Sequence, residues 1–143
     1  MNTMNPQYDC SVMPEVRADF HAILSEEALE QFIADMDNIA CDLKTPYLAS
    51  ATMWQAEYTS WPFRKLNYFR AGKQILEDFI ASNPNNIEAR YVRLLCQLNA
   101  PGFLNYNNIE EDRAFINANI STANLSEDYK KIMLFNIKKH TDN

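Results

Sequence analysis

The chain has 143 residues and a formal charge of −6, and hydrophobic residues make up 47% of it. This length suits one domain, and the apolar content suffices for a core, which excludes a wholly disordered chain. Two glycines are too few for the turns of an antiparallel sheet, and the acidic balance disfavours a nucleic-acid partner. The glycine count therefore argues against an all-β fold, and the helical pattern along the chain predicts an all-α protein.

Apolar residues recur at helical spacing over most of the sequence, after a polar stretch at residues 1–13 that we expect to be a flexible arm. The remaining residues, 14–143, are predicted to form a single all-helical domain, a compact bundle of about six to seven helices. The expected helices cover about residues 14–24, 25–43, 46–60, 63–82, 86–99 and 109–120, followed by a last helix from residue 126.

Capping sequences support three of these helix starts. Ser25 precedes two glutamates and is expected to cap the second helix. The pairs Asn85 with Glu88 and Asn108 with Glu111 have the spacing of a capping box, in which two side chains satisfy free backbone N–H groups reciprocally. We therefore expect helices to begin just after Asn85 and Asn108.

Residues 79–91 read FIASNPNNIEARY, in which a helix ends, an Asn-Pro-Asn-Asn turn reverses the chain and a new helix begins. This run resembles the junction between two tetratricopeptide repeats, and Gly72 falls where that repeat has a small residue. Moving by the repeat length of about 34 residues from Pro84 leads to Ser50 and Ala118, neither of them a proline. The resemblance therefore implies one tetratricopeptide-like hairpin inside a bundle.

A second resemblance covers residues 90–106 and 108–112, which are similar to an uncharacterised family of small helical bacterial proteins. It supports a tetratricopeptide-like helical fold over roughly residues 45–120 and implies no activity. Members of that family often carry a secretion signal, whereas residues 1–10 lack the basic and apolar segments of a signal peptide.

The three cysteines, Cys10, Cys41 and Cys96, follow no metal-binding or redox spacing. An odd number in a domain of ordinary size fits unpaired thiols in a reducing compartment, so a cytoplasmic location is expected, although a removed export signal stays an alternative. No apolar run reaches the roughly 18 residues needed to span a membrane.

Arg90, Arg93 and Gln97 are spaced to lie on one side of a helix, opposite its apolar face. One interpretation is an inter-helix network of salt bridges with the acidic residues 110–112. The other is that the arginines line a groove and bind a carboxylate of a peptide partner. The sequence leaves both open.

Aromatic residues at helical spacing between residues 47 and 61 are expected to lie mainly in the core. Trp61 and Phe63, beside the proline at residue 62, are the ones expected to be exposed and to anchor a partner. The apolar loop at residues 101–106 is expected to fold back over the helices as a plug.

His21 and His140 are the only histidines, and neither has the spacing of a metal-binding or catalytic motif. No catalytic residue, metal or cofactor is predicted. The leading hypothesis is a non-enzymatic helical domain that binds another protein or peptide, or serves as a scaffold. The alternatives are a small helical enzyme without a recognisable motif and a structural domain that associates with itself as a homodimer.

Overall fold

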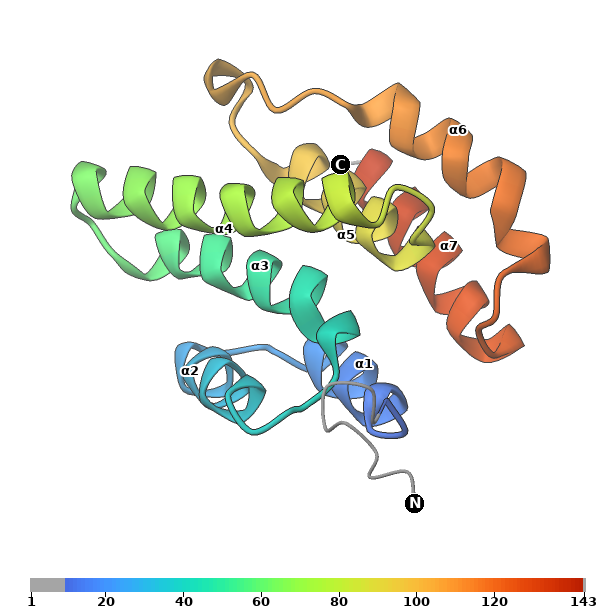
Figure 1. Cartoon of the computed structure of the whole chain (residues 1–143). Helices are drawn as coiled ribbons and strands as arrows, with labels where there is room; N and C mark the ends of the chain where they lie inside the picture. The colour runs from blue at the N-terminus through green and yellow to red at the C-terminus, as the bar shows by residue number, and fades with distance from the viewer. Residues whose placement is uncertain (1–9, 143) are drawn as a thin grey trace. The chain divides into compact units, whose positions relative to one another are not determined.

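The computed structural model describes residues 10–142, and within this range every regular element is helical (Figure 1). The seven α-helices are α1 (Met13–His21), α2 (Glu26–Met36), α3 (Thr45–Trp54), α4 (Pro62–Ser82), α5 (Ile87–Asn99), α6 (Ile109–Asn119) and α7 (Glu127–Thr141). Short 3-10 turns lie at Asp42–Lys44 (η2), Gln55–Tyr58 (η3), Gly102–Leu104 (η4) and Ile120–Thr122 (η5). The all-α prediction is confirmed.

The chain divides into two compact units, Met1–Phe79 (unit 1) and Ile80–Asn143 (unit 2). A single domain over residues 14–143 stays a prediction. Residues 1–9 of the predicted arm lie outside the described residues, while its last residue, Met13, is buried at the start of α1.

An aromatic cluster holds α1, α2 and α3 together in unit 1. The Phe20 ring lies 5.1 Å from that of Tyr47, 5.9 Å from that of Phe32 and 6.4 Å from that of Trp54, measured between centroids. Tilted and edge-on contacts of this kind add attraction to the burial of the rings. Tyr47 is fully buried, so the core position expected for this part of the aromatic stripe is confirmed.

Helix α2 ends at Met36, not near Leu43 as the apolar spacing predicted. The last carbonyls of a helix need donors from outside it. Here Lys44 provides one, because its Nζ donates to the backbone oxygens of Met36 and Ile39 at 2.6 Å each. After Met36 the chain leaves the helix and forms η2 before α3.

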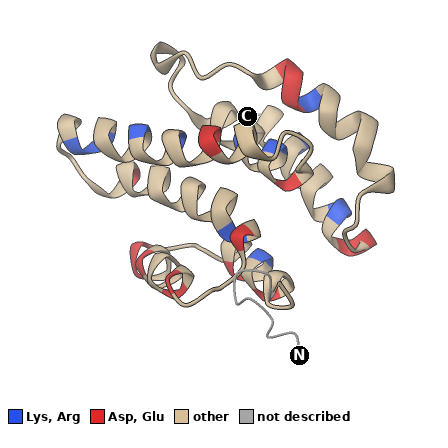
Figure 2. Ribbon diagram, viewed as in Figure 1, with Lys and Arg blue, Asp and Glu red and all other residues tan. Residues whose placement is uncertain are grey.

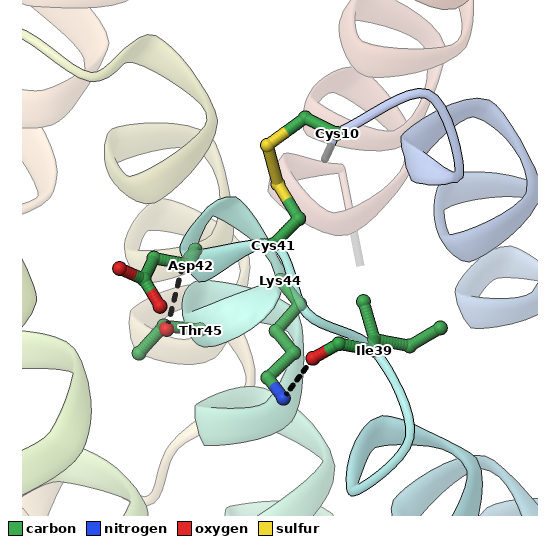
Figure 3. The surroundings of a disulfide bond; sticks show 6 residues. All are labelled: Cys10, Ile39, Cys41, Asp42, Lys44 and Thr45. Atoms are coloured by element: carbon green, nitrogen blue, oxygen red, sulfur yellow. Dashed lines mark hydrogen bonds between the residues drawn. A yellow bond between two sulfur atoms is a disulfide. The ribbon is translucent and has the colours of Figure 1, made fainter. Parts of the chain in front are cut away.

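A disulfide between Cys10 and Cys41 closes this part of unit 1 (Figure 3). Its Cα atoms are 5.0 Å apart, and the two cysteines are 31 residues apart in sequence. The expectation of three unpaired thiols was therefore wrong for two of them, while Cys96 is not part of this disulfide. The bond joins the segment before α1 to the residue before η2, a pairing that spacing alone does not reveal.

Gly72 allows α4 to approach α3 closely. A Cβ atom built on Gly72 would lie 2.5 Å from the backbone oxygen of Ala49 and 2.9 Å from the backbone nitrogen of Met53. Any larger residue would collide with the α3 backbone. The small residue expected at position 72 is thus explained by contact with α3.

Unit 2 is built around α5, which contacts both α6 and α7. Helix α5 is capped by Asn86, whose side-chain oxygen accepts from the Ala89 backbone N–H at 2.9 Å. The cap was expected one residue earlier, at Asn85, and the capping box with Glu88 does not form. The prediction was wrong by one position because two adjacent asparagines offer the same cap.

The starts of α2 and α7 are capped by serine side chains, whereas the start of α6 has no side-chain cap. Ser25 and Ser126 cap α2 and α7, each accepting a backbone N–H at 3.1 Å. Asn108 is the residue before α6, but its side chain accepts no backbone N–H there. Its Nδ2 donates to Glu111 Oε2 at 3.0 Å, so the second capping box was wrong as well.

Candidate functional site

The five residues that the sequence proposed for partner binding lie in two places. Arg90, Arg93 and Gln97 belong to α5 in unit 2, whereas Trp61 and Phe63 flank the start of α4 in unit 1. The two sets therefore form two separate candidate sites.

On α5, the three polar side chains face α6 and meet at Asp112. Arg93 donates to the two carboxylate oxygens of Asp112, from Nε at 2.8 Å and from Nη2 at 2.7 Å. Gln97 Nε2 adds a third hydrogen bond to the same carboxylate at 3.0 Å. Asp112 is completely buried and the Arg93 side chain is 5% exposed. This is a paired, hydrogen-bonded buried charge, the form in which an aspartate is tolerated in a core.

Gln97 also orders the start of α6. Its Oε1 accepts the backbone N–H of Asn108, the residue before that helix. In the capping box expected from the sequence, Glu111 would have accepted this N–H. The amide of Gln97 takes that role across the two helices, while its Nε2 holds Asp112.

Arg90 binds at the edge of the same network. It donates to the Pro84 carbonyl from Nη2 at 3.0 Å, to Glu111 at 3.0 Å and to Asp112 at 3.3 Å. Its guanidinium also lies 4.9 Å from the centroid of the Phe115 ring. The hydrogen bond from Arg90 is the main cause that lowers the pKa of the largely exposed Glu111, and the hydrogen bond with Asn108 adds to it. Arg90 thus joins the turn before α5 to α6.

These contacts correspond to the inter-helix network that the sequence offered as one of two interpretations. The donors that a carboxylate ligand would need are directed at Asp112, Glu111 and Pro84 within unit 2. Ligand binding by Arg90, Arg93 and Gln97 stays a prediction. Their contacts in unit 2 support the inter-helix network instead.

The second candidate site is the connection between η3 and α4, where aromatic side chains point into solvent. Trp61 is 65% exposed and Phe63 is 82% exposed, and Tyr58 is 39% exposed. We call these three residues the aromatic turn. The exposure expected for Trp61 and Phe63 beside the proline is observed.

Hydrogen bonds fix the backbone of the aromatic turn. Lys65 Nζ donates to the Ala56 carbonyl at 2.9 Å, which bridges the turn from α4 back to η3. The backbone N–H of Trp61 donates to Thr59 Oγ1 at 3.3 Å. Pro62 is the first residue of α4, a position where its fixed φ suits a helix start. The turn therefore presents its aromatic rings from a defined backbone.

Basic residues follow the aromatic turn, a feature that the sequence analysis missed. Between Glu57 and Glu77 the chain carries four basic residues and no acidic one. Three of the four, Arg64, Lys65 and Arg70, are exposed. A window of net charge along the sequence would have revealed this run, because the rest of unit 1 is rich in acidic residues.

The loop at residues 101–106 behaves only in part as the expected plug. Tyr106 is buried, but Phe103 is 82% exposed. Asn105 has a φ of 54°, a left-handed conformation that asparagine tolerates better than most residues. The loop thus directs one aromatic ring inward and leaves the other in solvent.

Helix α7 also exposes apolar side chains, namely Ile132, Leu134 and Phe135. At 100° per residue, Lys131 and Lys138 lie between Phe135 and Leu134 around the helix, and both lysines are exposed. These lysines therefore separate Leu134 from Phe135, whereas Ile132 and Phe135 are neighbours at i, i+3.

The histidines lie in different units, His21 in α1 and His140 in α7. Burial lowers the pKa of His21, and burial together with Lys139 lowers that of His140. Among residues 10–142, no three His, Cys, Asp or Glu side chains are grouped so that they could hold a metal ion.

None of the helices in the described part of the chain is both long and apolar enough to cross a membrane. Comparisons with protein-family models, with curated proteins and with solved structures return no match to this chain. The resemblances to tetratricopeptide repeats and to a bacterial family therefore stay predictions from the sequence.

Proposed function

We propose that this chain is a non-enzymatic helical binding domain and that the aromatic turn attaches it to its partner. One observation carries the proposal, which is that Trp61 and Phe63 are 65% and 82% exposed. Large aromatic side chains are the residues that contribute most to binding when a partner covers them.

The fixed backbone of the turn supports this role. A binding residue held in place before the encounter loses less conformational entropy when the partner covers it. The Lys65–Ala56 hydrogen bond and Pro62 supply this constraint here. Phe103 is as exposed as Phe63 but belongs to the 3-10 turn η4 in unit 2. It therefore serves as a matched control, an exposed phenylalanine outside the aromatic turn.

Within this proposal, the Arg90–Arg93–Gln97 network stabilises unit 2 and does not touch the partner. A buried arginine bonded to a fully buried carboxylate is a structural element whose disruption is costly. The tetratricopeptide-like hairpin is also retained as a proposal. It is supported by the end of α4 at Ser82 and the start of α5 at Ile87, which enclose the Asn-Pro-Asn-Asn turn.

The disulfide bears on where the domain works. The expectation of a reducing compartment rested on unpaired cysteines, and Cys10 and Cys41 are paired. Disulfides form and persist mainly in oxidising compartments. We therefore propose an oxidising location instead of the cytoplasm.

Photo-crosslinking tests the proposed function. A photoreactive phenylalanine analogue is placed at position 63 of the full chain in its native cells, and at position 103 as the matched control. We expect position 63 to form cross-links to a defined partner, identified by mass spectrometry as protein or lipid, and position 103 to form none. Equal products from both positions, or none from position 63, would show that the aromatic turn is not the binding surface.

A further inference from the structure

The charges that follow the aromatic turn indicate what kind of surface it meets. From Tyr58 to Leu76 the chain contains no acidic residue, while Arg64, Lys65 and Arg70 are exposed there. Figure 2 shows Lys and Arg spaced along α4 from the connection with α3, with acidic residues only toward the other end. The turn and the first half of α4 thus form a basic, aromatic surface.

The basic side chains share the exposed face of α4 with Phe63. Positions 63, 67 and 70 are spaced i, i+4 and i+7 and therefore lie on one side of the helix, with Arg64 next to them. Neither Arg64 nor Arg70 makes an ion pair or hydrogen bond with another residue in the described range 10–142. Their guanidinium groups are available to an anionic partner.

The exposure of the aromatic turn favours a lipid surface over a folded protein as its partner. Every residue from Ser60 to Lys65 is exposed, and the connection lies at one end of the α3–α4 pair (Figure 1). Binding to a folded protein with specificity commonly buries about 800 Å² on each side with close shape complementarity. A lipid interface requires no complementary walls, and it accepts aromatic rings at the level of the headgroups.

We infer that the aromatic turn docks on an anionic membrane surface, rather than on the protein or peptide that the sequence led us to expect. The rings of Trp61 and Phe63 enter the interface between headgroups and acyl chains, and Arg64 and Arg70 bind anionic headgroups. This mode is peripheral and requires no spanning helix. It rests on the proposed function, because it names the partner of the same surface.

The overall charge of −6 does not oppose this inference. Exposed charges are screened beyond a Debye length of about 8 Å at physiological ionic strength. The side chains nearest the lipid are therefore the ones that matter. The nearest acidic neighbour in sequence is Glu57, whose carboxylate accepts a hydrogen bond from Trp54 Nε1 at 3.0 Å.

The test uses lipid vesicles and the full, oxidised chain. Vesicles of equimolar phosphatidylcholine and phosphatidylglycerol are compared with pure phosphatidylcholine in a flotation assay, which needs no substitution in the core. In a Trp54→Phe background, Trp61 is the single fluorescent tryptophan and reports its own insertion. We expect flotation with the anionic vesicles and a blue shift of Trp61 emission. Both should weaken as salt is raised to about 0.5 M.

Matched variants test whether the residues of the aromatic turn and of α4 are the ones that contact the membrane. Each basic residue near an anionic membrane contributes about fivefold in affinity, so Arg64→Gln/Arg70→Gln should weaken binding roughly thirtyfold. Lys131→Gln/Lys138→Gln changes the net charge equally on exposed positions of α7 and should leave the affinity unchanged. Trp61→Ser/Phe63→Ser should abolish flotation, while Phe103→Ser should not.

The outcomes separate this inference from the proposed function. Absence of flotation and of a blue shift, equal binding to neutral vesicles, or an equal loss in the α7 variant would each overturn the membrane inference. If vesicles fail but position 63 still cross-links to one protein, the proposed function stands and its partner is that protein. If neither experiment shows binding at position 63, both proposals fall.

Discussion

Replacing Arg93 with methionine removes the main partner of the buried carboxylate of Asp112. Arg93 donates to both oxygens of that carboxylate at 2.8 and 2.7 Å. After the substitution, Asp112 would keep hydrogen bonds from Gln97 at 3.0 Å and from Arg90 at 3.3 Å. Methionine is close in volume to the aliphatic stem of arginine, so loss of packing is a minor part of the change.

The expected cost follows from leaving one buried charge with weaker partners. Removing one member of a buried ion pair commonly costs about 3–5 kcal/mol. Because Asp112 retains two donors, we expect Arg93→Met to lower the free energy of unfolding by about 3 kcal/mol, at the lower end of that range. This is a large fraction of the roughly 5–15 kcal/mol that stabilises a typical domain.

A double-mutant cycle tests the cause. Asp112→Leu leaves the Arg93 guanidinium buried and should cost about 3–5 kcal/mol, whereas Arg93→Met/Asp112→Leu removes both charges. The double variant loses mainly the hydrogen bond of Gln97 and should lie within about 2 kcal/mol of the unmodified chain. It should therefore be more stable than either single variant.

Denaturant unfolding followed by far-UV circular dichroism is the suitable assay. Both tryptophans lie in unit 1, at Trp54 and Trp61, so their fluorescence does not report directly on the α5–α6 contact. A change below about 0.5 kcal/mol for Arg93→Met, the range of ordinary surface substitutions, would refute the structural role of the network. A double variant as unstable as the sum of the single ones would also refute it.

Two further predictions concern unit 1. The Cys10–Cys41 bond spans 31 residues, and its reduction should lower the free energy of unfolding by about 3–4 kcal/mol. Unfolding is followed by tryptophan fluorescence with and without reductant. An unchanged unfolding midpoint would contradict this prediction. Gly72→Ala should gain about 1 kcal/mol of helix propensity but lose more, because its Cβ would lie 2.5 Å from the Ala49 oxygen. The control Asn67→Ala, on the exposed side of α4, should not be destabilised, and a more stable Gly72→Ala variant would rule out the close approach.

The helices were accessible from the sequence because their signals are local. Apolar spacing located α2 and α7, Ser25 marked the start of α2, and the residues after Ser82 defined the turn before α5. Local signals failed where the sequence was compatible both with a longer helix and with a turn. The apolar spacing continues to Leu43, but the helix ends at Met36, whose carbonyl accepts a hydrogen bond from Lys44 Nζ.

The Arg90–Arg93–Gln97 network was likewise predicted only in part from the sequence. Spacing placed Arg90, Arg93 and Gln97 on one face of a helix and indicated residues 110–112 as partners. It did not distinguish among the acidic residues, and the structure buries Asp112 completely while Glu111 stays 57% exposed. Only the direction in which α6 faces α5 decides which carboxylate is enclosed.

The sequence by itself determined the helical class, most helix starts and the exposure of Trp61 and Phe63, because propensity, capping and proline act within a few residues. It also contained the basic run after the aromatic turn, since a run of like charges is visible in the order of the residues. The tertiary structure alone decided the Cys10–Cys41 pairing, the choice of Asp112 and the contact of Gly72 with α3. Each of these depends on the approach in space of segments that are far apart in the sequence. Their separation along the chain does not show how close they lie in the fold.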